Sequence, residues 1–393
     1  MPLFASLAFS LATAAQATVE VPFRRAETAI ILDAVVNGRN VTLMFDTGFA
    51  GAVDVDNTIN LGKPTGKITL RDFVRETEAP TVKITSLKMG GQNINSTDME
   101  AVMSPPSDYS FVYNTHCDGL MGFDVIKHNI TEINFQNNKF IFHPASFDIT
   151  QRTPDNKTTF LVKMLPTGHN SVTLPVVTPS GQSMVLALDT GNSFYATTHK
   201  DVLERVGLWN SGDKYKFGSL AGVASGSVES FDLKMPKLVI FGVPVESSVW
   251  DIIDLPSSSA EGDGTVGFGF LKNFNVIIDY DRRRVWLENF TGKVGNEPEG
   301  ETGISATYSP SRKAVVVARV SPDSPADKAG LKEGDEILSV DGADMVRQNF
   351  RQMRDLLAGE VGSKVKMAVS RNGGLKRYEI ERQPLVNLAK GAS

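Results

Sequence analysis

The tripeptide Asp-Thr-Gly occurs twice in this chain, each time at the end of an apolar run that has the character of a strand. The first copy is Asp46-Thr47-Gly48, and the second, 143 residues later, is Asp189-Thr190-Gly191. A single short tripeptide carries little information, but two copies in matched contexts indicate a duplicated unit. The pattern therefore predicts two related halves that bring two carboxylates face to face.

The repeat continues beyond the two tripeptides. Each is followed by an Asp-Gly-x-x-Gly-Phe motif, at residues 118–123 and 263–268, and the offset from the first aspartate is 72 residues in one half and 74 in the other. Each motif leads into two further strand-like runs. A period near 143 residues is too long for a solenoid repeat, so it predicts an internal duplication of one domain.

Residues 19–290 have the pattern of an almost entirely β structure. Short runs rich in Val, Ile, Thr and Phe are separated by Gly, Asn, Asp and Pro. One helix is expected over residues 198–207, with Thr198 as its N-cap and Gly207 at its end, and short helices are expected near 123–127 and 268–272. Gly262–Gly267 fits a dinucleotide-binding glycine pattern, but an all-β context argues against that function.

Composition excludes several classes of function. The formal net charge of −5 and the pI near 5.7 disfavour binding to nucleic acid or to a membrane surface. The five histidines lack the spacing of metal ligands, so neither a metal site nor a cofactor is predicted. No segment after the N-terminus is apolar enough to span a bilayer, which predicts that the protein has no integral membrane segment.

The N-terminus and the cysteine content point to export. Residues 3–15 are apolar and uncharged, and Ala15-Gln16-Ala17 has the form of a signal-peptidase site, so residues 1–17 are expected to be a signal peptide. The alternative is a buried N-terminal segment of the mature fold. Cys117 is the only cysteine, expected to be small and buried, and an exported protein without disulfides fits a bacterial periplasmic or secreted location.

The two halves resemble the pepsin/retropepsin-like aspartyl protease family. In that family an apolar strand precedes each Asp-Thr-Gly, and an apolar-apolar-Gly motif follows later, as at residues 120–122 here; Thr265-Val266-Gly267 holds the same place in the second half. The resemblance covers residues 19–290. It implies a mostly β fold with two tandem β-barrel lobes, at residues 18–152 and 153–292, that form one cleft.

The resemblance also implies a catalytic pair, Asp46 and Asp189. Two carboxylates at hydrogen-bonding distance share one proton, so one can act as general base while the other donates. Which of the two holds the proton stays open. Asp118 and Asp263 are expected to have structural roles at strand ends. The residues expected to support the pair are Thr47, Gly48, Thr190, Gly191 and Asn192.

Residues 303–386 resemble a bacterial-type PDZ domain, which is a small α+β fold. The resemblance rests on Ser324-Pro325-Ala326, on residues 329–331 (Ala-Gly-Leu) and on residues 334–342, which follow a polar linker at 293–302. PDZ domains bind a peptide C-terminus as an added strand beside a helix. The resemblance implies a groove helix near 348–357 and a carboxylate-binding loop formed by Gly303, Ile304, Ser305 and Ala306.

Together these features predict an aspartic endopeptidase that hydrolyses bonds in a peptide or an unfolded protein. The PDZ domain would recruit substrate, by binding a peptide C-terminus, or regulate the cleft. The alternative is a catalytically silent peptide-binding adaptor that uses the cleft and the PDZ groove. Substrate specificity and the direction of regulation by the PDZ domain are left open.

Overall fold

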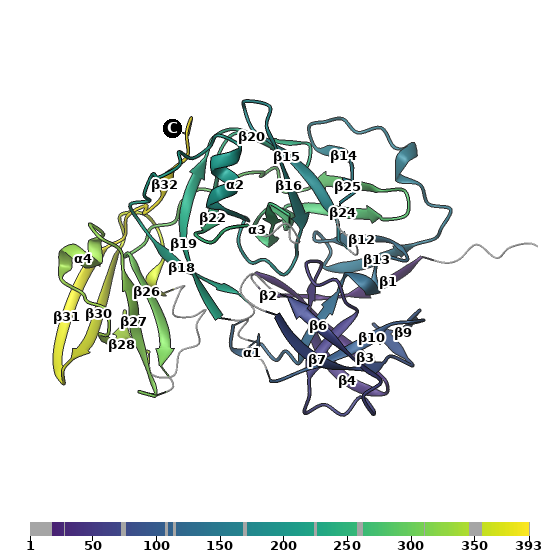
Figure 1. The fold of residues 1–393 in the computed structure, drawn as a ribbon, viewed down its shortest axis with the longest axis horizontal. Coiled ribbons are helices and arrows are strands. Elements are labelled where there is room, and N and C mark those ends of the chain that lie inside the picture. Colours follow the sequence, from purple (N-terminus) through teal and green to yellow (C-terminus); the bar gives the residue numbers. More distant parts are fainter. Residues whose placement is uncertain are drawn as a thin grey trace, which may run out of the picture.

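The computed structural model describes residues 18–26, 28–71, 76–106, 109–112, 115–167, 171–223, 226–257, 262–309, 311–345 and 356–392. The chain is mostly β with a few short helices, as expected (Figure 1). The expected signal peptide and residues 348–355 of the expected groove helix lie outside the described residues. Within the described ranges, no helix combines the length and apolarity needed to cross a bilayer.

The first half of the chain forms a ten-stranded sheet, called the first sheet. Its strands run in the order β6-β7-β10-β5-β11-β4-β3-β8-β9, and β2 also pairs with β3. Apolar side chains alternate along these strands and enter a common core. The strands are β2 (Arg24–Ala26), β3 (Ala29–Val36), β4 (Arg39–Asp46), β5 (Val53–Asp56), β6 (Gly66–Arg71), β7 (Glu76–Lys83), β8 (Leu87–Met89), β9 (Gln92–Ile94), β10 (Glu100–Ser104) and β11 (Gly119–Gly122).

The second half forms the second sheet, which also has ten strands. Its order is β18-β19-β22-β17-β23-β16-β15-β20-β21, and β32 adds to β19. The strands are β15 (Thr173–Val177), β16 (Ser183–Leu188), β17 (Ala196–His199), β18 (Ser219–Val223), β19 (Gly226–Met235), β20 (Leu238–Ile240), β21 (Val243–Val245), β22 (Ser248–Ile253), β23 (Gly264–Val266) and β32 (Asn387–Leu388).

The two sheets share one topology. Position by position, β6 corresponds to β18, β4 to β16 and β11 to β23, so the strand that ends at each Asp-Thr-Gly occupies the same place in its sheet. Each of these strands also runs parallel to the strand of the later Asp-Gly motif, β4 with β11 and β16 with β23. The repeat in the sequence is therefore accompanied by a repeat in strand order.

A third sheet of six strands joins the two halves and is called the shared sheet. Its order is β1-β13-β12-β24-β25-β14, and the halves meet where β12 pairs antiparallel with β24. The rings of Phe135 and Phe268 pack edge to face across this junction, with centroids 5.7 Å apart. The strands are β1 (Val19–Pro22), β12 (Ile130–Asn134), β13 (Lys139–His143), β14 (Thr159–Lys163), β24 (Phe274–Asp279) and β25 (Arg284–Asn289).

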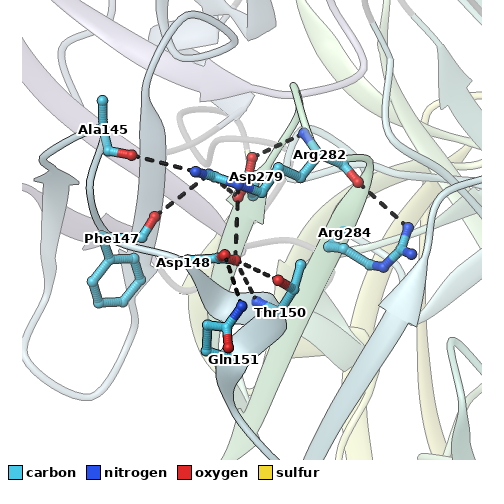
Figure 2. Close-up of polar contacts among 8 residues, drawn as sticks. All are labelled: Ala145, Phe147, Asp148, Thr150, Gln151, Asp279, Arg282 and Arg284. Atoms are coloured by element: carbon cyan, nitrogen blue, oxygen red, sulfur yellow. Dashed lines mark hydrogen bonds and ion pairs between the residues drawn. The ribbon is translucent and has the colours of Figure 1, made fainter.

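An arginine fixes the chain where it passes from the first half to the second (Figure 2). Arg282, in the turn between β24 and β25, donates to the Asp279 carboxylate at 2.8 Å and reaches the carbonyl oxygens of Ala145 and Phe147 at 3.4 and 3.5 Å. Its Nε lies 3.8 Å from Asp148, whose carboxylate caps the 3-10 helix η2 (Ile149–Gln151). One guanidinium thus binds groups from both sides of the crossing.

The helices are short. Besides η2, they are α1 (Tyr109–Val112), η1 (Phe123–Val125), α2 (Lys200–Arg205), α3 (Phe268–Leu271) and α4 (Pro325–Ala329). The helices η1, α2 and α3 lie within the ranges expected from the sequence, whereas α1 and α4 were not predicted. The expected cap of α2 is wrong, because the N-cap is His199, whose side chain makes no capping bond. Thr198 lies in β17 instead and its hydroxyl donates to the carbonyl of Asp263 at 2.5 Å, a contact made by the tertiary structure.

The C-terminal part has its own sheet and its own apolar core. The sheet runs in the order β26-β27-β28-β30-β31, with β29 paired to β28. Ser324 caps α4 by accepting the amide of Asp327 at 3.2 Å, Pro325 follows it, and Gly330 ends the helix with a left-handed φ of 86°. The strands are β26 (Ile304–Ser309), β27 (Ala314–Val320), β28 (Glu336–Val340), β29 (Ala343–Asp344), β30 (Lys364–Arg371) and β31 (Gly374–Glu381).

The expected linker at 293–302 is held along its length by hydrogen bonds. The Asn296 side chain accepts the amide of Val249 at 2.9 Å and donates to the carbonyl of the same residue at 3.2 Å. Further on, Gly300 forms an isolated bridge with Gly359 in the C-terminal part. The linker is therefore bound first to the second sheet and then to the domain that follows.

Candidate functional site

Two aspartates lie at equivalent strand ends in the two halves. Asp46 is the last residue of β4, and Asp189 directly follows Leu188, the last residue of β16. Both side chains are partly exposed. The Asp189 amide donates to the carbonyl of Val266 at 3.0 Å, which holds the turn after β16 against β23. The duplicated topology is what positions one carboxylate from each half.

The two threonines of the tripeptides hold the halves together. The Thr47 hydroxyl donates to the carbonyl of Leu188 at 2.7 Å and accepts the Thr190 amide at 2.9 Å. Reciprocally, the Thr190 hydroxyl donates to the carbonyl of Phe45 at 2.9 Å and accepts the Thr47 amide at 3.1 Å. All four bonds are buried, so the relative position of the strand ends is tightly fixed.

The glycines of the tripeptides let the two turns approach each other. A Cβ atom built on Gly48 would lie 2.8 Å from the carboxyl carbon of Asp189, and one built on Gly191 would overlap the carboxyl group of Asp46. Any side chain at either position would displace the opposite carboxylate. The structure thus brings together all the residues that the sequence grouped around the pair, which are Asp46, Thr47, Gly48, Asp189, Thr190, Gly191 and Asn192.

The two carboxyl groups titrate as a pair. Burial raises the pKa of Asp46 well above its usual range, and the charge of Asp189 and a hydrogen bond to it raise the pKa further. Burial also raises the pKa of Asp189, against the lowering effect of its hydrogen bond to Asp46. Such a pair can hold one proton and can both accept and donate at one place. Backbone amides donate hydrogen bonds to both carboxyl groups. Asp46 accepts from Gly48 at 2.7 Å and from Phe49 at 3.2 Å. Asp189 accepts from Gly191 at 2.9 Å and from Asn192 at 3.1 Å.

One residue near the pair was missed by the sequence analysis. The Thr265 hydroxyl is hydrogen-bonded to Asp189, and this bond lowers the pKa of that carboxyl. The Asn192 amide nitrogen lies 2.7 Å from the same hydroxyl oxygen. The sequence does show a difference at this position of the repeat. The second residue after Asp263 is Thr265, whereas the second residue after Asp118 is Leu120.

The aspartates of the later motif are structural, as expected. The Asp118 carboxylate accepts the amide of Thr42 at 2.8 Å, and that of Asp263 accepts the amide of Val185 at the same distance. Each therefore holds the beginning of the motif strand against the strand that leads to the pair. Cys117 is buried, as predicted, and burial raises the pKa of its thiol.

A further carboxyl group is half-buried in the first sheet and was not singled out by the sequence analysis. Asp54 lies in β5, where it pairs with Leu120 of β11. Burial raises its pKa to about 6, although hydrogen bonds from Ser104 favour the ionised form. Within the described part of the chain, its Oδ1 atom has no hydrogen-bond partner. Its position in the sheet corresponds to that of Thr197 in the second half.

The expected carboxylate-binding loop is mostly strand. Gly303 has a left-handed φ of 87°, but Ile304, Ser305 and Ala306 belong to β26 and pair with β27. The register shifts between Ser305 and Ala306. The prediction of a loop was wrong for these three residues, because pairing with the following strand takes up the backbone from Ile304 onward. β26 is an outer strand of its sheet.

Comparison with known proteins finds one family and several partial relatives. A PDZ-domain family matches residues 316–371. A probable CtpA-like serine protease of Staphylococcus haemolyticus is 32% identical over 20% of this chain and 16% of its own length. The chloroplastic C-terminal processing peptidase of Tetradesmus obliquus is 39% identical over 18% of this chain and 16% of its own. The periplasmic pH-dependent serine endoprotease DegQ of Escherichia coli is 33% identical over 31% of this chain and 27% of its own.

Two solved structures show partial likeness. A photosystem II D1 C-terminal processing protease is 30% identical over 23% of this chain and 25% of its own, with a TM-score of 0.23. An aspartic proteinase from Irpex lacteus is 13% identical over 71% of this chain and all of its own, with a TM-score of 0.42. Both TM-scores are below 0.5, so neither likeness bears on the fold or activity of this chain.

These relatives correct the expected class of enzyme. They are named serine proteases and processing peptidases, which contradicts the prediction of an aspartic-type endopeptidase and leaves the pepsin/retropepsin resemblance without support. The adaptor alternative is no better, since the relatives are proteases. The reason for the error is that the two Asp-Thr-Gly motifs predict a pair of carboxylates but do not determine which reaction the protein catalyses.

The chain spans only 16% to 27% of the length of these relatives. The segment that the family comparison identifies, residues 316–371, is a PDZ domain.

Proposed function

We propose that this chain is an exported hydrolase that acts on peptides or unfolded proteins, and that Asp46 and Asp189 lie at its reaction centre. The observation that carries the proposal is the pair itself, two partly exposed carboxyl groups that lie together at related strand ends and whose pKa values are both raised by burial. The four threonine bonds between the halves support it, because they hold the two groups in one geometry. Preorganised proton donors and acceptors are what general acid–base catalysis requires.

The PDZ domain supports the choice of substrate. The protease relatives and the PDZ domain both fit a peptide or protein substrate. We place the binding of a peptide C-terminus at the outer edge of β26, beginning at Gly303, Ile304, Ser305 and Ala306, because an added strand can pair there. Export is supported by the name of the DegQ relative, which is a periplasmic protein.

The test is cleavage of a mixed peptide library from about pH 3 to about pH 8 by the wild type and by the variants Asp46→Asn and Asp189→Asn. We expect the wild type to release products and each variant to lose at least about a hundredfold in rate, because each removes one member of the pair. Asp98→Asn, at an exposed turn, is the matched control and should cleave like the wild type.

A second arm asks which group reacts, using a fluorophosphonate that labels serine nucleophiles. Products that disappear with the fluorophosphonate but persist in both asparagine variants would make the protein a hydrolase whose reaction centre lies elsewhere. No products at any pH would overturn the hydrolase proposal. Loss of products in both asparagine variants is the outcome that we expect, and labelling by the fluorophosphonate then shows whether a serine nucleophile takes part.

A further inference from the structure

The proposed peptide site on the PDZ domain lies beside the second half of the chain. β26 is an outer strand of the PDZ sheet, and β18 is an outer strand of the second sheet. Residues of these two strands are in contact, and Figure 1 shows β26 next to β18 and β19. Within the described part of the chain, no backbone ladder joins the two strands. A peptide that adds to β26 would therefore come close to β18.

One arginine of the PDZ domain reaches across this contact. Arg319, near the end of β27, forms an ion pair with Glu229 of β19. A Cβ atom built on Gly218 would lie 2.6 Å from the Nη2 atom of Arg319, so the guanidinium also lies against the residue before β18. Ser321 donates to the carbonyl of Gly218 at 2.5 Å. Side chains at the end of β27 thus attach the PDZ domain to the second sheet.

The position of Arg319 in the PDZ sheet places it at the proposed peptide site. Arg319 pairs with Ser305, which belongs to the segment 303–306 where we place the peptide C-terminus. Residues directly opposite each other in a ladder have their side chains on one face, so a strand added to β26 would continue the row of Ser305 and Arg319. Because the Ser305 side chain is short, a longer group on the added strand can extend over it to the guanidinium.

The charge of this region defines the chemistry of the ligand. Arg319 is the only charged residue in the sequences of β26 (Ile304–Ser309) and β27 (Ala314–Val320). A guanidinium presents paired N–H donors that match a carboxylate. Glu229 supplies that carboxylate in the peptide-free protein, with 53% of its side chain exposed. An ion pair so open to water adds little stability, so the carboxylate of a peptide can replace it.

We propose that Arg319 recognises a carboxylate of the peptide bound by the PDZ domain, and that Glu229 occupies Arg319 while no peptide is bound. This inference rests on the proposed function, because it assigns a residue to the peptide site proposed there. The peptide and Glu229 compete for one guanidinium. Binding of the peptide therefore releases β19 from the PDZ domain, and attachment of β19 weakens binding of the peptide by the same factor.

Retention of synthetic octapeptides on the immobilised full-length protein tests this competition. The octapeptide library is used in two forms, one with a free terminal carboxylate and one with a terminal amide. Glu229→Gln should retain about twofold to fivefold more peptide than the wild type, because the competing carboxylate is gone. A gain confined to the free-acid form identifies the terminal carboxylate as the ligand group. A gain in both forms that is limited to peptides with Asp or Glu identifies an acidic side chain.

Two further variants separate competition from a general change in charge. Arg319→Gln should abolish the preference for peptides that carry a carboxylate. The double variant with Glu229→Gln and Arg319→Gln should behave like Arg319→Gln alone, because Glu229 acts only through Arg319. Glu246→Gln is the matched control, since it removes an acid of the second half that pairs with Lys237, and it should retain peptides like the wild type.

Amide hydrogen exchange measures the release of the second sheet. Adding the retained peptides to the wild type should speed exchange in residues 219–223 of β18 severalfold, because an edge strand loses a contact. In Glu229→Gln the exchange of these residues should be fast before any peptide is added. Exchange in the wild type that does not respond to peptide would contradict the release.

The outcomes distinguish this inference from the proposed function. Equal retention by the wild type and Glu229→Gln would overturn the inference and leave the peptide site in place. No retention by any variant would overturn the peptide site together with the inference. If retention follows the expected pattern in a protein that cleaves no peptide, the hydrolase proposal fails and the role of Arg319 is supported.

Discussion

At the scale of single residues, the Asp54 carboxyl group shows how strongly burial changes the pKa of one side chain. It lies on a strand whose neighbouring residues, Val53 and Val55, enter the apolar core. Burial raises its pKa to about 6, so folding favours the protonated form. A raised folded-state pKa contributes stability that is fully present below the unfolded value near 3.8 and is lost as the pH rises through 6.

We therefore expect Asp54→Asn to raise the free energy of unfolding at pH 8 by up to about 3 kcal/mol, since two pKa units correspond to that amount. At about pH 4 the variant and the wild type should differ little. Urea unfolding monitored by tryptophan fluorescence at both pH values measures this. Asp98→Asn, which changes an exposed carboxylate, is the control. A variant that is equally stabilised at both pH values would show that titration of Asp54 is not the cause.

At the scale of elements, the position of β11 depends on a glycine at its first residue. Gly119 has a φ of 157°, and a Cβ atom built there would overlap the carbonyl oxygen of Asp54 on β5. Gly264 occupies the same place in β23 and would meet the carbonyl of Thr197 in the same way. β11 and β23 can therefore approach β5 and β17 this closely only because their first residue, glycine, has no side chain.

Replacing Gly119 by Ala should destabilise the protein by more than about 3 kcal/mol, because backbone strain and a steric overlap add together. Gly38→Ala is the matched control. Gly38 also has a positive φ, of 80°, but a Cβ atom there meets nothing within 4 Å, so only the strain of about 1 kcal/mol is expected. Equal midpoints of urea unfolding for the two variants would refute the role of the close approach.

At the scale of the whole molecule, the C-terminal part is attached to the second half of the chain both through its tail and through residues at the end of β27. The tail after β31 returns and adds β32 in parallel to β19, which lies beside β18. Asn387 anchors it, accepting the amide of Lys216 at 2.7 Å and donating to the carbonyl oxygens of Phe217 and Asp232 at 2.9 and 3.0 Å. Elsewhere, Ser321, which follows β27, donates to the carbonyl of Gly218 at 2.5 Å. The segment before β18 is thus bound by both the tail and the PDZ domain.

Asn387→Ala should loosen this attachment, because it removes the hydrogen bonds that the side chain makes to the backbone of the segment before β18 and of β19. We expect amide hydrogen exchange in residues 384–392 and in 216–219 to speed up roughly tenfold or more, while the core of the PDZ sheet is unaffected. Exchange followed by mass spectrometry measures this. Gln383→Ala, at an exposed side chain just before the tail, should leave both segments unchanged. Faster exchange throughout the molecule would point instead to global destabilisation.

The sequence alone was enough to predict a mostly β chain with short helices near 123–127, 198–207 and 268–272, because the signals of these elements are local. The duplicated tripeptide was likewise enough to predict that Asp46 and Asp189 belong together. It was not enough to determine the class of reaction, which the relatives contradict.

Only the tertiary structure decided which groups surround Asn192, Asp54 and Thr198. The partner of the Asn192 amide is Thr265, 73 residues away along the chain, and the burial of Asp54 depends on its place between β11 and β10. Likewise, Thr198 has the local features of a helix cap but gives its hydroxyl to Asp263. Propensity and periodicity act between near neighbours in sequence, whereas a pKa or a hydrogen bond depends on whichever group packing brings within about 3 Å.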